Sequence, residues 1–146
     1  MAAHRLWSPD RRDMIWINCN PQAGREMRDV HPLLVLSPKA FNESTGIVIG
    51  LPMTTATFNE TNPFAVKFKG PKKEASYILG HQPKSFDWRI REAKPHPWKH
   101  VPEDVFIRAC ETLNQIIAIT QYPYACESNP PARRAAAPHR RGIAIP

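Results

Sequence analysis

Short apolar runs alternate with polar and proline-containing breaks through most of the chain. Runs of this length that are rich in β-branched and aromatic residues predict strands rather than buried helices. The run from Phe64 alternates apolar and polar residues, which indicates a strand with one exposed face. The predicted strands cover residues 13–18, 33–36, 46–51, 64–69 and 75–79, and two prolines keep residues 94–101 extended.

The breaks between these runs predict turns and loops. Pro32 is expected to end a polar loop before the second strand, and Pro52 is expected to end the third strand. Residues 38–45 predict a turn-rich connection, residues 58–62 a loop, and residues 82–91 a mixed polar segment. Trp16, inside the first apolar run, is expected in the core.

One helix is predicted over residues 102–119. Pro102 suits the first turn, and Glu103 and Asp104 lie near the positive end of the helix dipole. An apolar face recurs at helical spacing and should cover the open side of the sheet. The residues of this face are Val105, Phe106, Ala109, Cys110, Leu113, Ile116 and Ile117. The pattern therefore predicts a mainly β fold, a small curled sheet or barrel capped by a C-terminal α-helix.

Composition divides the chain into three parts. Residues 1–12 are polar and expected to be flexible, residues 13–120 form the folded domain, and residues 121–146 read as a disordered Pro/Arg-rich tail. The formal charge is +7, of which the tail contributes +3, so the body is only mildly basic. That balance permits a nucleic-acid partner without requiring one.

The cysteines and the hydropathy pattern indicate a compartment. Three cysteines without a short pairing motif favour a reduced, cytoplasmic protein. No apolar run reaches the length of a transmembrane helix, and the first residues lack the apolar core of a signal peptide, so no membrane association is expected.

The stretch from Asn20 to Ser37 is the main candidate for chemistry. Asn20 to Gly24 spells a turn, because Pro21 fixes its φ and Gly24 permits a positive φ. A charged loop follows and leads into a buried strand, which is a common way to hold functional groups in place. An ordinary solvated hairpin loop is the alternative on charge alone.

Several ordered motifs then carry a family resemblance over residues 12–120. They are Asp13–Ile17, Asn20–Gly24 with Glu26, His31-Pro32, Val35–Pro38, Thr45-Gly46, Leu51–Thr55, Pro63–Val66, Gln82–Arg89 and Val101–Glu103. With these motifs the sequence resembles the MazF/PemK (Kid-like) family of toxin ribonucleases. The resemblance implies an SH3-like β-barrel, a homodimer, and cleavage of single-stranded RNA without metal or other cofactor. It also implies a small acidic antitoxin, and operator DNA as a partner of the toxin–antitoxin complex.

Residues carried over from the family are the candidate site. Glu26 matches the loop glutamate, and Thr54 matches a hydroxyl position that could donate to a phosphate oxygen. His31 stands where the family usually has arginine, and His81 stands where the Kid-like branch has an aspartate proposed as base. Leu79 replaces an arginine of that branch.

Metal-free RNA cleavage needs one group to take the 2′-hydroxyl proton and another to protonate the leaving oxygen. Histidine can do both, because imidazole titrates near neutrality. Two histidines at the two altered positions therefore predict an acid–base pair, with Glu26, His31, Thr54 and His81 as catalytic candidates. The RNA-binding candidates are Arg25, Arg28, Thr55, Gln82, Lys84, Ser85 and Arg89.

Other functions stay open at this point. A histidine does not replace the fixed fork of an arginine, so the chain could bind RNA, DNA or an antitoxin without turnover. A CcdB-like gyrase poison would share the barrel, and a housekeeping barrel would mediate protein contacts only. The spacing of His96 and His100 is a weak metal-site pattern, because Pro97 lies between them.

Overall fold

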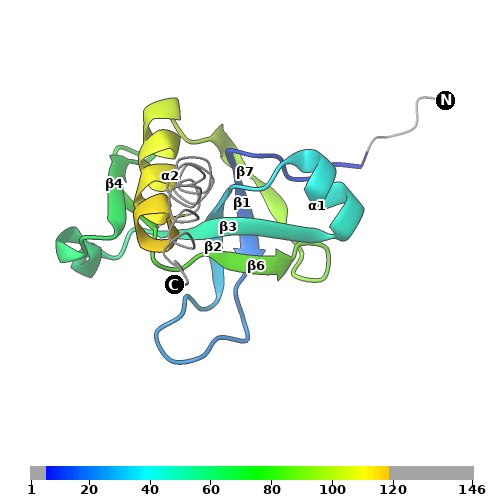
Figure 1. Ribbon diagram of the computed structural model, residues 1–146, viewed down its shortest axis with the longest axis horizontal. Helices are drawn as coiled ribbons and strands as arrows, with labels where there is room; N and C mark the ends of the chain where they lie inside the picture. The colour runs from blue at the N-terminus through cyan, green and yellow to red at the C-terminus, as the bar shows by residue number, and fades with distance from the viewer. Residues whose placement is uncertain (1–5, 119–146) are drawn as a thin grey trace, which may run out of the picture. The chain divides into compact units, whose positions relative to one another are not determined.

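The computed structural model describes residues 6–118, which form a mainly β fold with a C-terminal helix (Figure 1). By internal contacts the chain divides after Leu113, and only residues 114–118 of the second unit are described. The strands are β1 (Asp13–Asn18), β2 (Val30–Val35), β3 (Ile47–Thr54), β4 (Ala65–Lys69), β5 (Ala75–Leu79), β6 (Lys84–Asp87) and β7 (Lys94–His100). The helices are α1 (Lys39–Thr45), the 3-10 helix η1 (Thr57–Thr61) and α2 (Glu103–Ile117).

The strands form one curled antiparallel sheet in the order β4-β5-β3-β2-β1-β7, with β6 paired to β3. β3 is long enough to pair with β2, β5 and β6 at different points along its length. Among the described strands, β4 and β7 lie at the two ends of this order and do not pair with each other, so the sheet stays open as a half-barrel. The expected mainly β fold with a C-terminal helix is confirmed.

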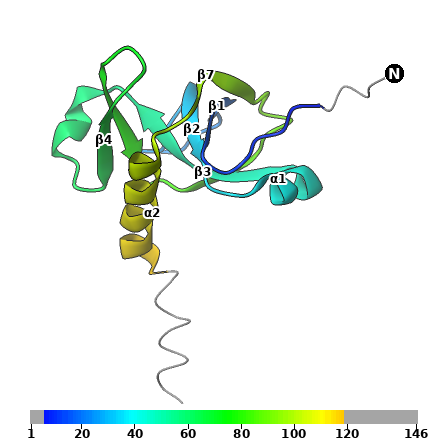
Figure 2. The ribbon, with the colours of Figure 1, turned by 90° about the horizontal axis from the view of Figure 1, so that it is seen from above.

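The part of α2 up to Leu113 covers one face of this sheet, as its apolar spacing predicts (Figure 2). Val105, Ala109 and Leu113 are buried against the sheet. Ile116 and Ile117, which the sequence assigns to the same face, are 41% and 46% exposed. The sheet residues in this core are Met14, Leu34, Leu51, Met53, Val66, Phe68 and Ile78.

A second core lies on the other face of the sheet, where β6 and the segment after it cover β1, β2 and β3. Trp88 belongs to it, and its indole Nε1–H donates to the carbonyl of Asn42 at 2.8 Å. The strand residues of this core are Ile15, Ile17, Leu33, Val35, Val48 and Phe86. With both faces packed, the central strands have little freedom to change register.

Two prolines lie inside strands that they were expected to bound. β2 begins at Val30 rather than after Pro32, and β3 runs through Pro52 to Thr54. Pro32 faces Trp16, and Pro52 faces Leu33. An antiparallel strand directs only alternate N–H groups at a given neighbour, so a proline can occupy a position whose N–H is not needed there.

Four further expectations from the sequence are wrong. Residues 38–45 contain the helix α1, which the buried Asn42 fixes by donating to the carbonyls of Pro9 and Ser37. Residues 58–62 lie mostly in η1, and β6 lies inside the segment 82–91. Trp16 is 36% exposed rather than buried in the core, and it packs against His96.

The ends of the predicted domain are partly described. Ser8 and Pro9 are buried beside α1, while the flexibility expected of residues 1–12 stays a prediction. α2 ends at Ile117, and the expected helix end at Ile119 and the expected tail 121–146 lie outside the described residues. Within residues 6–118, no helix has the length and apolar character needed to span a membrane.

Candidate functional site

A groove with a volume of about 930 Å³ lies where three segments meet. The segments are the loop between β1 and β2, the end of β3 with η1, and the turn after β5. The lining residues are Arg25, Glu26, Met27, Arg28, Asp29, His31, Thr54, Ala56, Phe58, Asn59, Asn62, Leu79, His81 and Gln82. All four catalytic candidates and three RNA-binding candidates therefore lie in one groove.

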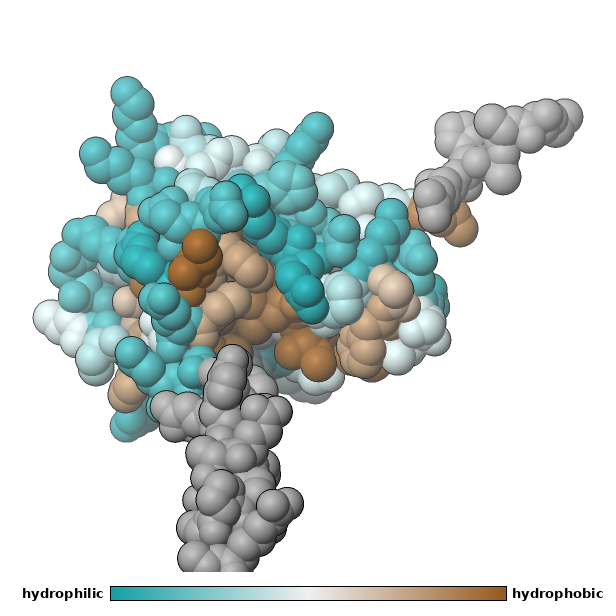
Figure 3. Space-filling model, turned by 45° about the horizontal axis from the view of Figure 1, so that its top comes forward, coloured by the Kyte–Doolittle hydropathy of each residue, from teal (hydrophilic) through white to brown (hydrophobic). Residues whose placement is uncertain are grey.

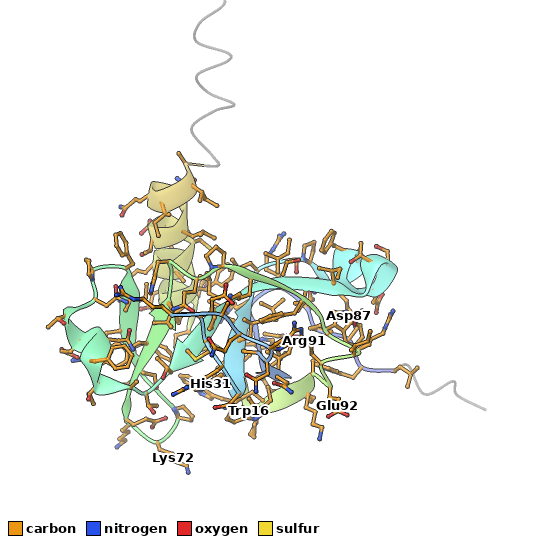
Figure 4. All side chains as sticks on the ribbon, turned by 90° about the horizontal axis from the view of Figure 1, so that it is seen from below. Trp16, His31, Lys72, Asp87, Arg91 and Glu92 are labelled. Carbon is orange, nitrogen blue, oxygen red and sulfur yellow. The ribbon has the colours of Figure 1, made fainter. Side chains whose placement is uncertain are left out.

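Strand register explains why His31 and Thr54 share it. Leu33 on β2 faces Pro52 on β3. Side chains two residues apart on a strand lie on the same face, so continuing this register by two residues places His31 opposite Thr54. Figure 4 shows His31 on β2, and Thr54 faces Tyr77 on the next strand, β5. β5 then leads through Leu79 to His81.

The hydroxyl of Thr54 is oriented by its own backbone. The N–H of Ala56 donates to Thr54 Oγ1 at 3.1 Å. Because the oxygen accepts this bond, the hydroxyl hydrogen remains able to donate to a ligand oxygen in the groove.

Gln82 connects His81 to the loop on the far side of the groove. Its Oε1 accepts the N–H of Met27 at 3.0 Å, and its Nε2 donates to the carbonyl of Arg25 at 3.4 Å. A backbone N–H can only donate, so this bond identifies the amide oxygen of Gln82 and turns its NH₂ group toward His81. Gln82 Nε2 lies 3.5 Å from His81 Nε2, a long contact that favours the tautomer with the proton on Nδ1.

Glu26 is held by an ion pair. Its carboxylate lies 3.0 Å from Lys84 Nζ and accepts the N–H of Ala23 at 3.3 Å. The hydrogen bond from Lys84 and then that from Ala23 lower the pKa of Glu26 below its ordinary value. A carboxylate with a lowered pKa is a weak base near neutrality, so the geometry suits Glu26 to fixing the loop.

The base of the loop is closed by polar contacts. Asn20 and Asp29 exchange two hydrogen bonds, of 3.1 and 3.0 Å, and Asp29 adopts a left-handed φ of 65°. Arg91, labelled in Figure 4, donates to the carbonyls of Asn18 and Asn20. Gly24 has a φ of 54°, as the turn motif predicts.

The opposite wall of the groove is η1. Glu60 on this helix accepts from Tyr77 Oη at 2.5 Å and from Lys67 Nζ at 2.6 Å. The hydrogen bonds from Lys67 and then Tyr77 lower the pKa of Glu60, and the bond to Glu60 raises the pKa of Tyr77. An ionised Glu60 therefore holds η1 against β4 and β5.

Four of the predicted RNA-binding residues do not line the groove. Lys84 reaches it only through Glu26, and Thr55 and Ser85 are exposed outside the lining. Arg89 lies elsewhere: its guanidinium stacks 4.7 Å from the ring centre of Trp88 and donates to the carbonyl of Glu43. That side chain lines a separate cavity with Leu6 and Trp7, because the turn after β6 carries it away from the groove.

Sequence reasoning missed several lining residues, among them Phe58, Asn59 and Asn62. Their segment was expected to be a loop, and the available signal was an aromatic residue isolated among polar neighbours. Within residues 6–118, no three His, Cys, Asp or Glu side chains gather as a metal site would require.

Comparison with known proteins identifies the fold and the family. Residues 10–117 match the family described as the PemK-like, MazF-like toxin of type II toxin-antitoxin systems. The endoribonuclease toxin MazF of Escherichia coli K12 is 36% identical over 85 residues, which cover 58% of this chain and 74% of that protein.

Two solved structures of Deinococcus radiodurans proteins share the fold. A crystal structure of MazF has a TM-score of 0.69 and 31% identity, covering 77% of this chain and 99% of that chain. A MazE–MazF structure has a TM-score of 0.65 and 30% identity, covering 78% of this chain and 100% of that chain. The family match spans the whole described fold and the groove, and the chain belongs to the PemK-like, MazF-like toxins of type II toxin–antitoxin systems.

Proposed function

We propose that this endoribonuclease toxin cleaves single-stranded RNA in the groove between the β1–β2 loop and η1, using the ribose 2′-hydroxyl as nucleophile. The observation that carries the proposal is the convergence of His31, Thr54 and His81 on one groove from three separate strands or turns. Cations and a hydroxyl donor beside two imidazoles match what phosphodiester cleavage without metal requires.

In the proposed reaction, one imidazole takes the proton of the 2′-hydroxyl. The bond from O2′ to phosphorus forms while the bond from phosphorus to O5′ breaks. The other histidine, as imidazolium, gives its proton to the leaving 5′-oxygen, so the products carry a 2′,3′-cyclic phosphate and a 5′-hydroxyl. The Gln82 contact favours the tautomer of His81 with an unprotonated Nε2. We therefore propose His81 as the base, with the 2′-hydroxyl taking the place of the Gln82 donor at that nitrogen.

The remaining groups bind the phosphate and fix the groove. Thr54 donates its hydroxyl hydrogen to a phosphoryl oxygen, and Arg25 and Arg28 supply positive charge from the loop. Glu26 and Lys84 hold that loop, and Gln82 orients His81 as a positioning residue. Arg89 has no part in this proposal, because its cavity is a separate one.

Cleavage in the presence of a chelator tests the proposal directly. Single-stranded RNA should be cut across a bell-shaped pH profile, and His31→Ala or His81→Ala should each remove about 10²- to 10⁴-fold of kcat. Thr54→Val should cost about 10²-fold or more, whereas Thr54→Ser should retain most of the activity. Binding of RNA without cleavage at any pH would instead favour the non-catalytic alternative.

The proposal includes an acidic antitoxin and a second copy of the chain. The MazE–MazF structure concerns a relative, and the two groove arginines suit an acidic segment here. Hydrophobic side chains gather in the middle of one face (Figure 3). Phe41 on α1 and Ile49 on β3 are hydrophobic side chains that are 36% and 38% exposed. Leu36 lies beside Ile49, because its N–H donates to the carbonyl of Ile49 at 2.8 Å, and α1 contacts β3. We assign Leu36, Phe41 and Ile49, the apolar patch, to the homodimer interface.

Two further expectations come from the sequence alone, one from the family resemblance and one from the cysteines and hydropathy pattern. Operator DNA would be bound by the toxin–antitoxin complex, and the protein would act in the cytoplasm. Both stay predictions.

A further inference from the structure

Phe58 is 79% exposed although it lines the groove. It belongs to neither hydrophobic core cluster. Single exposed apolar side chains are common on protein surfaces, and Ile90 is 81% exposed. Phe58 differs from Ile90 because its ring lines a groove, where an aromatic side chain can contact a ligand.

The backbone that carries Phe58 is firmly held. The buried Asn59 donates its side-chain Nδ2 to the carbonyl of Ala56 at 3.1 Å and accepts from Asn62 at 3.3 Å. Next to it, Glu60 joins η1 to Tyr77, which is only 2% exposed. Phe58 is thus an exposed ring on an anchored turn, which is the arrangement that limits the entropy lost when a ligand stacks on it.

The other walls of the groove identify the chemistry of that ligand. Arg25 and Arg28 line it from the loop, which suits an anionic backbone, and Thr54 offers a hydroxyl donor between the loop and η1. Single-stranded nucleic acids are held by cations that contact phosphates and by aromatic rings that stack on bases. Across the groove, His81 packs against Phe64 with their ring centres 6.1 Å apart, so its imidazole already has an aromatic neighbour.

We infer that Phe58 is a base-stacking platform for one nucleotide beside the cleaved phosphate and a determinant of cleavage specificity. The inference rests on the proposed cleavage of RNA and adds the residue that selects the nucleotide. A larger base covers more of the ring, so the platform favours a purine over a pyrimidine at its position. The Glu60–Tyr77 contact acts as its positioning device.

A binding cycle tests the stacking. A single-stranded oligoribonucleotide protected by 2′-O-methyl groups is titrated with the protein, together with versions that each lack one base. Removal of one particular base should weaken binding to the wild type roughly ten-fold. Phe58→Ala should weaken binding of the intact oligonucleotide by a similar factor. This variant should bind the intact oligonucleotide and the version that lacks that base with equal affinity. Phe58→Trp should keep the effect, and Ile90→Ala, which removes an 81% exposed side chain outside the groove, should change nothing.

Mapping the cleavage sites on a long RNA separates this inference from the proposed function. The wild type should prefer a purine at one position, and Phe58→Ala should lose that preference and cleave with a KM raised roughly as much as its binding is weakened. Full binding by Phe58→Ala with an unchanged cleavage pattern would overturn the platform and leave the nuclease in place. An intact stacking cycle without any cleavage would overturn the nuclease and leave the platform. A change in sedimentation of Phe58→Ala without a change in RNA binding would assign the ring to a second copy and overturn the inference.

Discussion

Glu26 and Lys84 form a 3.0 Å ion pair that joins the loop before β2 to the first residue of β6. The two residues are far apart in sequence, and the loop carries both groove arginines. The ion pair therefore anchors the charged loop to the packed sheet, and the positions of Arg25 and Arg28 depend on that anchor.

Removing this pair should loosen the loop. Glu26→Gln should lower kcat/KM roughly ten-fold, because misplaced positioning groups slow the reaction without changing the chemistry. Hydrogen exchange at the Ala23 and Met27 amides should become faster in this variant, while Glu111→Gln on α2 serves as an exposed control. Unchanged exchange at both amides would contradict the assigned role.

The same pair predicts a pH dependence. The pKa of Glu26 is lowered in the folded protein, so the stability that its ion pair gives the loop is fully present above the ordinary pKa of 4.5. The contribution is lost as the pH falls through the lowered pKa. Protection of the two loop amides, measured against pH, should decline in that acid range in the wild type and be flat in Glu26→Gln.

Gln82 should matter for catalysis more than for stability. Gln82→Leu loses the acceptor for Met27 and the amide that faces His81, and kcat should fall roughly ten- to a hundred-fold. Its thermal unfolding should stay close to that of Gln115→Leu, an exposed control on α2. A pH–rate profile identical to that of the wild type would show that Gln82 does not position His81.

His96 should weaken the fold when it is protonated. Burial lowers its pKa, and its Nδ1 accepts the N–H of Trp98 at 3.1 Å, which requires an unprotonated nitrogen. The contribution of neutral His96 to the stability of the fold is therefore complete above the ordinary pKa of 6.5 and is lost as the pH falls through the lowered pKa. Urea unfolding of the wild type should show a free energy of unfolding that decreases as the pH is lowered between these two values. His96→Asn keeps an acceptor without titrating, so it should show a smaller slope.

The apolar patch should control self-association. Ile49→Lys places a charge within the patch and should convert a dimer into a monomer in sedimentation, with the fold preserved because Ile49 is 38% exposed. Ile90→Lys, at a side chain 81% exposed and outside the patch, is the matched control. If Ile49→Lys and the wild type sediment equally, the assignment of the apolar patch to the dimer interface is wrong.

The local sequence pattern predicted an element correctly where the residues of one segment define its bounds. β1 at Asp13–Asn18 and β5 at Ala75–Leu79 have the predicted bounds, because β-formers and flanking breaks define them locally. It failed at Pro52 and at residues 39–45. Whether a proline breaks a strand depends on which neighbour needs its N–H, and α1 depends on the burial of Asn42 against Pro9. Neither contact is visible in the segment itself.

The sequence by itself determined the mainly β fold, the amphipathic C-terminal helix and the candidates His31, Thr54 and His81, because periodicity and ordered motifs are properties of the chain. Only the tertiary structure decided that these three share one groove, that Arg89 lies elsewhere and that Phe58 joins them. The physical reason is strand register. Leu33 pairs with Pro52, and the same register continued by two residues places His31 opposite Thr54. A register shift of one residue would turn either side chain to the opposite face of the sheet.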